Sequence, residues 1–222
     1  MKTSFAGYLM SYFFLLAGSA FAADSPQLTG NCSPATEDAV KSYFLPIKDK
    51  TYRYDTLGAT DSGQGNDIFK SITYTSSNNR DGEFNALLKT VAYLGSMKIK
   101  SSEVYSIACN KVHHTANENE VFGAKTFSDR PVVLILPVKG KDTHWTWSNE
   151  GERHKYSATF VDKVVTPLRV FSDVLLVSDE DNSVNVVTKS YYAKGYGLVK
   201  EECFDKKGHT VSVGSSQLVR ID

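Results

Sequence analysis

The sequence predicts a mainly β protein built on a single antiparallel, strongly curved sheet, either a half-barrel or a sandwich-like meander, with one or two short helices. Runs rich in valine, isoleucine, threonine and tyrosine recur along the chain, and some alternate between apolar and polar residues. Turn signals such as Asn149-Glu150-Gly151 and Asp205-Lys206-Lys207-Gly208 separate these runs. Strands that follow one another without intervening helices favour an antiparallel meander.

The first 22 residues are typical of a secretory signal peptide. Lys2 precedes an apolar run over 5–17, and Ala20-Phe21-Ala22 forms an A-x-A cleavage site. The run is shorter than the roughly 20 residues that cross a bilayer. No lipoprotein signal precedes Cys32. We therefore expect a soluble mature chain that starts at Ala23, has no membrane span, and is periplasmic or extracellular.

Residues 23–222 are expected to form a single β-rich domain. The full chain has 25 basic and 25 acidic residues, and Lys2 is the one charge in the signal segment. The mature chain therefore carries a net charge of −1. This balance gives no argument for nucleic acid or an anionic membrane as a partner.

One short helix is expected after Ser33. Ser33 could cap it, Pro34 suits the first helical position, and Glu37 and Asp38 favour its positive end. Pro46 should stop it.

Strands are expected over most of the remaining chain. Phe84 to Leu94 fits either a short helix or a long strand, because Leu87, Leu88, Val91 and Leu94 have helical spacing. Turn-rich segments are expected at 58–66, 76–82 and 179–182. The expected strands cover 51–55, 68–74, 103–109, 132–136, 143–147, 154–165, 173–177, 184–192, 198–204, 210–213 and 218–221.

Three cysteines, Cys32, Cys109 and Cys203, lie in the mature part. In an oxidising compartment two of them can pair. Cys32 lies in an irregular segment, where the backbone can adapt to disulfide geometry. The expected pair is Cys32 with Cys109, and Cys203 is the alternative partner.

The sequence carries no recognisable catalytic motif. The five histidines lack the spacing of a metal site, and no serine lies in a G-x-S-x-G elbow. We therefore predict no catalytic residues, no metal and no cofactor, and we expect the protein not to be an enzyme.

Gly195 and Gly197 interrupt a β-favouring run and are predicted to be structural. Glycine in a strand often marks a bulge or a place where a neighbour packs across the backbone. The proposed neighbour is Trp145 or Trp147. Tyr191, Tyr192 and Tyr196 are further aromatic candidates for this packing.

The C-terminal half resembles a family of uncharacterised secreted bacterial proteins and lipoproteins. The residues that carry this resemblance are Leu136-Pro137, Trp145, Trp147, Thr166-Pro167, Phe171 to Leu175 and Tyr191 to Val199. The resemblance implies a curved sheet like the half-barrels of lipoprotein-carrier (LolA/LolB-type) proteins, and it implies no known activity. Leu168-Arg169 departs from the family pattern, which puts the local turn in doubt.

The expected function is non-enzymatic binding of an apolar or envelope-derived ligand, and no motif assigns its contact residues. A structural or protein-interaction module of the cell envelope, acting through edge strands, is the alternative. An envelope hydrolase is the third hypothesis. A large apolar cavity would favour the first, an exposed apolar patch the second, and a cleft with paired carboxylates or a His–carboxylate pair the third.

Overall fold

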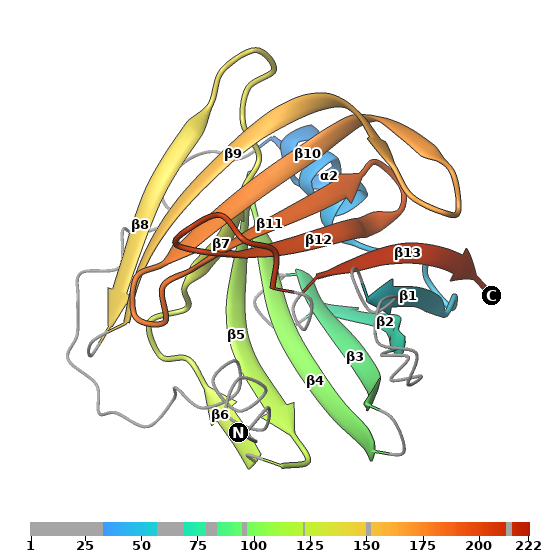
Figure 1. Cartoon of the computed structure of the whole chain (residues 1–222). Helices are drawn as coiled ribbons and strands as arrows, with labels where there is room; N and C mark the ends of the chain where they lie inside the picture. Colours follow the sequence, from blue (N-terminus) through green and yellow to red (C-terminus); the bar gives the residue numbers. More distant parts are fainter. Residues whose placement is uncertain are drawn as a thin grey trace.

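The computed structural model describes residues 33–56, 69–78, 84–94, 97–121, 123–149, 152–211 and 215–222. In these ranges thirteen strands form one antiparallel sheet, and one helix, α2 (Pro34–Phe44), lies against it (Figure 1). The sheet is curved and not closed, so the prediction of a mainly β protein with a single curved antiparallel sheet is confirmed. The predicted signal peptide, Cys32 and the loop over 58–66 lie outside the described residues.

The sheet consists of two meanders that meet at strands β1 and β13. Along the sheet the order is β6-β5-β4-β3-β2-β1-β13-β12-β11-β10-β9-β8, and β7 pairs with β5 off this path. The first meander contains β1 (Tyr52–Thr56), β2 (Phe69–Asn78), β3 (Phe84–Leu94), β4 (Met97–Ala108), β5 (Lys111–Asn119), β6 (Gly123–Thr126) and β7 (Val132–Ile135). The second contains β8 (Thr143–Asn149), β9 (Glu152–Val165), β10 (Val170–Asp181), β11 (Val186–Ala193), β12 (Gly197–Asp205) and β13 (Ser216–Ile221).

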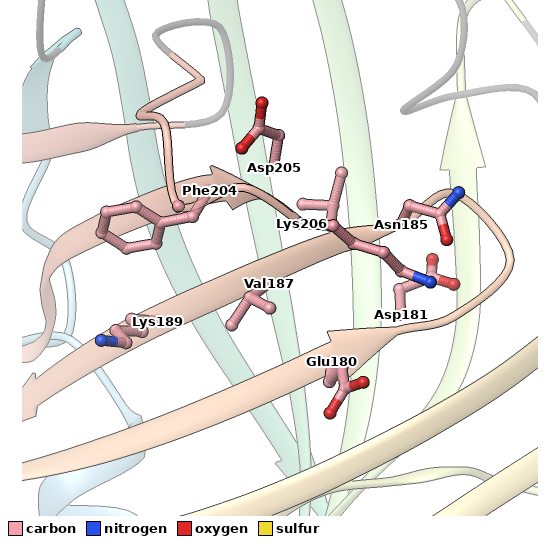
Figure 2. A pocket seen from close by; sticks show the side chains of 10 residues that line it. Glu180, Asp181, Asn185, Val187, Lys189, Phe204, Asp205 and Lys206 are labelled. Carbon is pink, nitrogen blue, oxygen red and sulfur yellow. The ribbon is translucent and has the colours of Figure 1, made fainter.

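Strands β10, β11 and β12 lie side by side and end together near the β10–β11 turn (Figure 2). Glu180 pairs with Val187, which in turn pairs with Phe204. Because successive side chains of a strand alternate between faces, these three side chains share one face of the sheet. This face is called the outer face, since the buried Leu175 and Val177 alternate onto the other side, toward α2.

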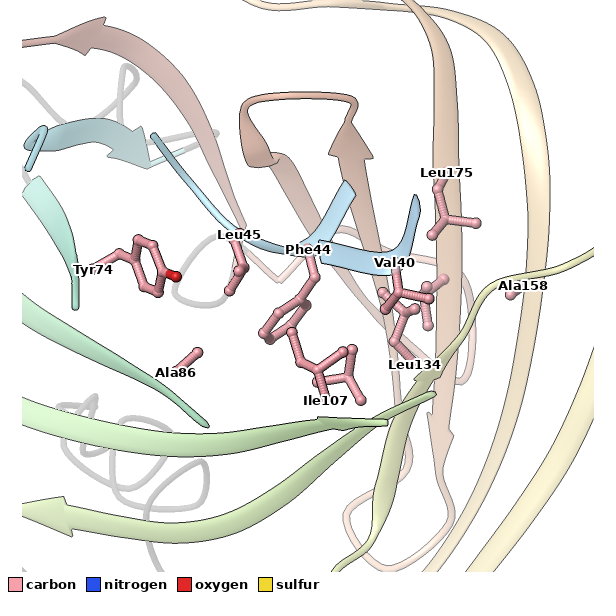
Figure 3. Close-up of a cluster of buried hydrophobic side chains, with 11 residues drawn as sticks. Val40, Phe44, Leu45, Tyr74, Ala86, Ile107, Leu134, Ala158 and Leu175 are labelled. Carbon is pink, nitrogen blue, oxygen red and sulfur yellow. The ribbon is translucent and has the colours of Figure 1, made fainter. Parts of the chain in front are cut away.

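Helix α2 fills the space between the two meanders. It contacts β4 and β5 of the first and β11 and β12 of the second. Val40 and Phe44 are buried and belong to an apolar cluster that also contains Ile107 and Leu175 (Figure 3). The Phe44 ring lies 5.0 Å from the Tyr105 ring and 5.9 Å from the Tyr192 ring, between centroids. The interior of the curved sheet is thus occupied by the protein's own helix.

The helix forms where the sequence predicts it, with one difference in its cap. Pro34 is its first residue, and Glu37 lies in its first turn and forms an i,i+4 ion pair with Lys41 at 2.5 Å. Ser33 occupies the N-cap position, but its side chain makes no capping hydrogen bond. The helix ends at Phe44, two residues before Pro46, because the residue before a proline disfavours the helical conformation.

Several strand boundaries differ from the prediction. The ambiguous segment Phe84–Leu94 is strand β3, which pairs with β4 along its whole length and with β2 from Phe84 to Tyr93. Residues 76–78 and 179–181 were expected in turns but continue β2 and β10, and Thr210 forms an isolated bridge to Phe204. Strands β5 and β6 were not predicted. The polar sequence of β5 does not indicate a strand. The segment is a strand because its backbone pairs with that of β4.

Candidate functional site

An open pocket of about 680 Å³ lies around the joined ends of β10, β11 and β12 (Figure 2). We call it the hairpin pocket. Its apolar floor comes from Val187 and Phe204, which are cross-strand neighbours on the outer face. Charged and amide side chains surround this floor. The lining residues are Glu180, Asp181, Asn185, Val186, Val187, Lys189, Phe204, Asp205, Lys206 and Gly208.

Two of the pocket's carboxylates hold its turns in shape. Asp181 Oδ1 accepts the backbone N–H of Ser183 at 2.8 Å in the β10–β11 turn. Asp205 Oδ1 accepts the backbone N–H groups of Lys207 and His209, both at 2.8 Å, in the turn after β12. These bonds to a carboxylate lower the pKa of Asp205. Such Asx-type bonds fix the backbone of short turns.

The aromatic ring of Phe204 is half-buried and lies under a positive charge. Lys189 Nζ stands 5.2 Å from the centre of the ring. At this distance an ammonium group is attracted by the negative face of the ring. The pocket therefore combines an aromatic surface with hydrogen-bonding groups of both polarities.

A histidine–carboxylate cluster lies beside the pocket on the inner face of β9 and β10. His154 Nδ1 lies 2.9 Å from Asp179 Oδ1, and His154 Nε2 lies 4.0 Å from Asp181 Oδ2. The side chains of His154, Asp179 and Asp181 are 16%, 29% and 24% exposed. Because Asp181 also lines the hairpin pocket, the cluster and the pocket share one residue.

Burial and charge act in opposite directions in this cluster. Burial disfavours the imidazolium, but the hydrogen bond to Asp179 and the negative charges of Asp179, Asp181 and Glu152 outweigh it, so the pKa of His154 is raised. Burial raises the pKa of the Asp179 carboxyl, and the bond to His154 opposes it. Burial also raises the pKa of Glu152.

The two carboxylates face both nitrogens of the same imidazole ring. A general base needs one nitrogen directed at a nucleophile or substrate. Here Asp179 and Asp181 flank both nitrogens, while the rings of Trp147 and Tyr156 pack against the imidazole at 5.3 and 5.7 Å between centroids. The arrangement suits a charged imidazolium that joins two strands.

The predicted aromatic residues lie in two separate places. Trp145 and Trp147 are on β8: Trp145 stacks on Tyr156 at 5.1 Å, and its indole donates to the backbone oxygen of Val132 at 2.8 Å. Trp147 donates to Asp129 Oδ2 at 2.7 Å. On β11, the Tyr191 hydroxyl donates to Glu202 at 2.8 Å, whereas Tyr192 packs on Phe44.

Gly195 and Gly197 have positive φ angles of 78° and 72° and lie at the β11–β12 turn. The prediction that a tryptophan packs across them is wrong. The atoms nearest to a Cβ at Gly197 would be the backbone of Phe44, Leu45 and Pro46, at 2.8–3.0 Å. Gly195 donates its backbone N–H to the Ser42 oxygen at 2.5 Å. Tyr196 packs on Phe171 at 5.1 Å. The β11–β12 turn therefore packs directly against the C-terminal end of α2 and the residues that follow it.

The turn at Thr166-Pro167-Leu168-Arg169, where the chain departs from the family pattern, is regular. Thr166 N–H donates to the Arg169 oxygen at 3.1 Å, and the strands on either side pair from Val165 and Val170 onward.

Cys109 lies in the β4–β5 turn and has a φ angle of 57°. Cys203 is buried on β12, and its Sγ lies 3.5 Å from Thr188 Oγ1. Because Cys32 lies outside the described residues, its pairing with Cys109 stays a prediction.

Within the described ranges, no group of three or more histidine, cysteine, aspartate or glutamate side chains is arranged to hold a metal ion. In the same ranges, no helix has the length and apolar character required of a membrane span.

No protein-family model matches the chain, and a search of curated proteins gives no match. Two solved structures are similar to it. One is a predicted exported protein with a YmcC-like fold from Bacteroides fragilis NCTC 9343, with 12% identity and a TM-score of 0.42, covering 82% of this chain and 99% of its own. The other is a predicted lipoprotein from Parabacteroides distasonis ATCC 8503, with 13% identity and a TM-score of 0.40, covering 82% of this chain and 99% of its own.

Proposed function

We propose that the protein is an exported, non-enzymatic binding protein of the cell envelope or its surroundings, and that its ligand occupies the hairpin pocket. The observation that carries this proposal is the pocket itself: an apolar floor of Val187 and Phe204 within reach of several charged and amide side chains. Pockets of a few hundred Å³ with an apolar surface and a few polar groups are the usual form of small-molecule sites.

The proposed ligand lies outside the interior of the curved sheet. An apolar molecule in that interior would compete with Val40 and Phe44 of α2, which are almost fully buried there. Removing those side chains from their contacts would cost several kcal/mol. An external pocket can be filled without that cost, which supports an envelope-derived ligand that is not wholly apolar.

The contacts of His154 support a role without catalysis. The third hypothesis, an envelope hydrolase, asks for a His–carboxylate pair, and His154 with Asp179 is such a pair. A second carboxylate lies at the other ring nitrogen, where a nucleophile would have to stand. The cluster is therefore better suited to stabilising the β9–β10 wall beside the pocket.

A protein-interaction module is the second candidate, since β6 and β8 end the sheet and can offer backbone groups to a partner strand. Crosslinking in intact cells, followed by mass spectrometry, separates the two. Crosslinks to a partner protein concentrated on β6 or β8 would favour the interaction module.

Native mass spectrometry of protein purified from its own envelope tests the binding function. The expected result is a bound small molecule that is lost in Phe204→Ala and kept in the control Lys207→Ala, which changes a residue next to the pocket but outside its lining. A ligand retained equally by both variants, or no ligand at all, contradicts the proposal. N-terminal sequencing tests export: the mature chain should begin at Ala23, and an intact Met1 in a membrane fraction would contradict it.

A further inference from the structure

The hairpin pocket contains polar groups that the fold itself does not use. Asp181 and Asp205 are engaged in their turns. In contrast, among the contacts of the described residues no hydrogen bond or ion pair involves the side chains of Glu180, Asn185 or Lys206. Figure 2 shows Lys206 extending across β11 toward the β10–β11 turn, where Asn185 lies. These three side chains are available to a ligand.

The lining carries charges of both signs: Glu180, Asp181 and Asp205 are acidic, and Lys189 and Lys206 are basic. Of the three available side chains, Glu180 accepts hydrogen bonds, Lys206 donates them, and Asn185 does both. A strongly charged ligand would be attracted by the lining groups of one sign and repelled by those of the other. A purely apolar ligand would remove water from the charged side chains without offering them hydrogen bonds in return, which is unfavourable. The lining therefore favours a neutral molecule that offers donors and acceptors together.

The floor adds a requirement for an apolar surface on the same molecule. Val187 and Phe204 form an apolar strip, and Lys189 supplies a further donor above the ring. A sugar ring has this combination, because its C–H groups form apolar patches and its hydroxyls, which both donate and accept, surround its rim.

We infer that the hairpin pocket binds a neutral sugar unit, with its C–H surface on Val187 and Phe204 and its hydroxyls at Glu180, Asn185 and Lys206. This inference rests on the proposed binding function and specifies its ligand class. Because the pocket is open along the ends of three strands, a unit within a longer glycan chain can enter as well as a free sugar.

Asn185 provides the sharpest variant for a test. Its φ angle is 61°, a conformation that glycine adopts without strain. Asn185→Gly therefore removes the amide side chain and leaves the turn intact. Asp49→Gly is the matched control, since Asp49 has the same φ of 61° and lies before β1, outside the pocket lining. Glu180→Gln is a second variant, which removes the charge and keeps the size.

The full-length mature protein is applied to an array of neutral and charged oligosaccharides, and hits are measured by isothermal titration calorimetry. We expect binding to at least one neutral oligosaccharide. Asn185→Gly, Glu180→Gln and Phe204→Ala should each weaken it about tenfold or more, and Asp49→Gly should change it less than twofold. Selective binding of charged glycans, no binding to any neutral glycan, or equal binding by all variants overturns the inference.

The test separates the inference from the function on which it rests. If the array is negative while native mass spectrometry finds a different ligand that Phe204→Ala loses, the binding function stands and the sugar assignment fails. If neither experiment gives a ligand that depends on the pocket, both fail.

Discussion

A Cβ atom at Gly197 would lie 2.8 Å from the backbone nitrogen of Pro46, with Leu45 C and Phe44 O at 3.0 Å. Backbone atoms cannot move aside as a side chain can. The glycine thus allows the segment after α2 to lie directly against the start of β12, and it fixes the helix inside the sheet.

Replacing Gly197 with alanine should lower the free energy of unfolding by more than the same change at Gly195. Both residues have positive φ, so both variants carry backbone strain of about 1–2 kcal/mol. Only Gly197 also meets close backbone atoms, and overpacking of this kind adds about 1–3 kcal/mol. Urea denaturation of the two variants measures the difference. Equal losses would show that the close approach has no energetic weight.

The contribution of His154 to stability should depend on pH. Because its folded-state pKa is raised above 6.5, the stabilisation is fully present below about pH 6.5 and is lost as the pH rises through the raised value. A charge-assisted bond of this kind contributes about 1.5–3 kcal/mol. His154→Gln should therefore differ most from the unmodified protein near pH 5.5 and least near pH 9, in urea denaturation.

His209→Gln is the control for that measurement. His209 also faces a carboxylate, Asp205, at 3.0 Å, but its side chain is 73% exposed. Exposed pairs contribute about 0–1 kcal/mol. A pH dependence of similar size in both variants would mean that the cluster around His154 adds nothing specific.

The disulfide should join Cys32 to Cys109. The helix that follows Cys32 along the chain packs on β4 and β5, whose connecting turn contains Cys109. Thiol titration of the unfolded, unreduced protein should find about one thiol per chain. Cys109→Ser should raise this to two and Cys203→Ser should lower it to none. The reverse pattern would identify Cys203 as the partner.

Phe44→Ala should destabilise the protein by about 3–5 kcal/mol, the usual cost of removing a buried phenylalanine. Phe44 is 5% exposed and contacts rings from both meanders. Asp38→Ala, on the exposed side of the helix, should cost less than about 0.5 kcal/mol. Thermal and urea denaturation measure both. A loss below 1 kcal/mol at Phe44 would show that α2 is not part of the core.

The sequence predicts strands well where one face is apolar. Ile72 and Tyr74 are buried and Thr73 is exposed, as their alternation indicates. Prediction from the sequence fails where pairing with neighbouring strands determines the structure. Lys111–Asn119 is polar and has no clear alternation, yet it pairs with β4, β6 and β7. Phe84–Leu94 has helical spacing, but pairing on both edges makes it a strand.

The candidate site could not be derived from the sequence because it depends on register. His154 and Asp181 are 27 positions apart, and they face each other only because the four-residue turn at 166–169 sets the β9–β10 pairing. From the pair Val165–Val170 at this turn, an uninterrupted register places His154 opposite Asp181 and Tyr156 opposite Asp179, so the turn is the sequence signal that locates the cluster. The hairpin pocket requires a second register, that of β11 with β12.

The pairing of β1 with β13 has a consequence for the order in which the sheet can form. Tyr52 pairs with Ile221, and β13 joins β12 through two residue pairs, Lys200–Gln217 and Glu201–Ser216. The strand at the middle of the sheet is therefore the last of the described strands along the chain. Until it is in place, β1 and β12 each present an open edge, the kind of surface at which unfinished chains associate with one another. Contacts between such distant residues also form slowly. The halves can be assembled separately, but the step that joins them must wait for the final strand.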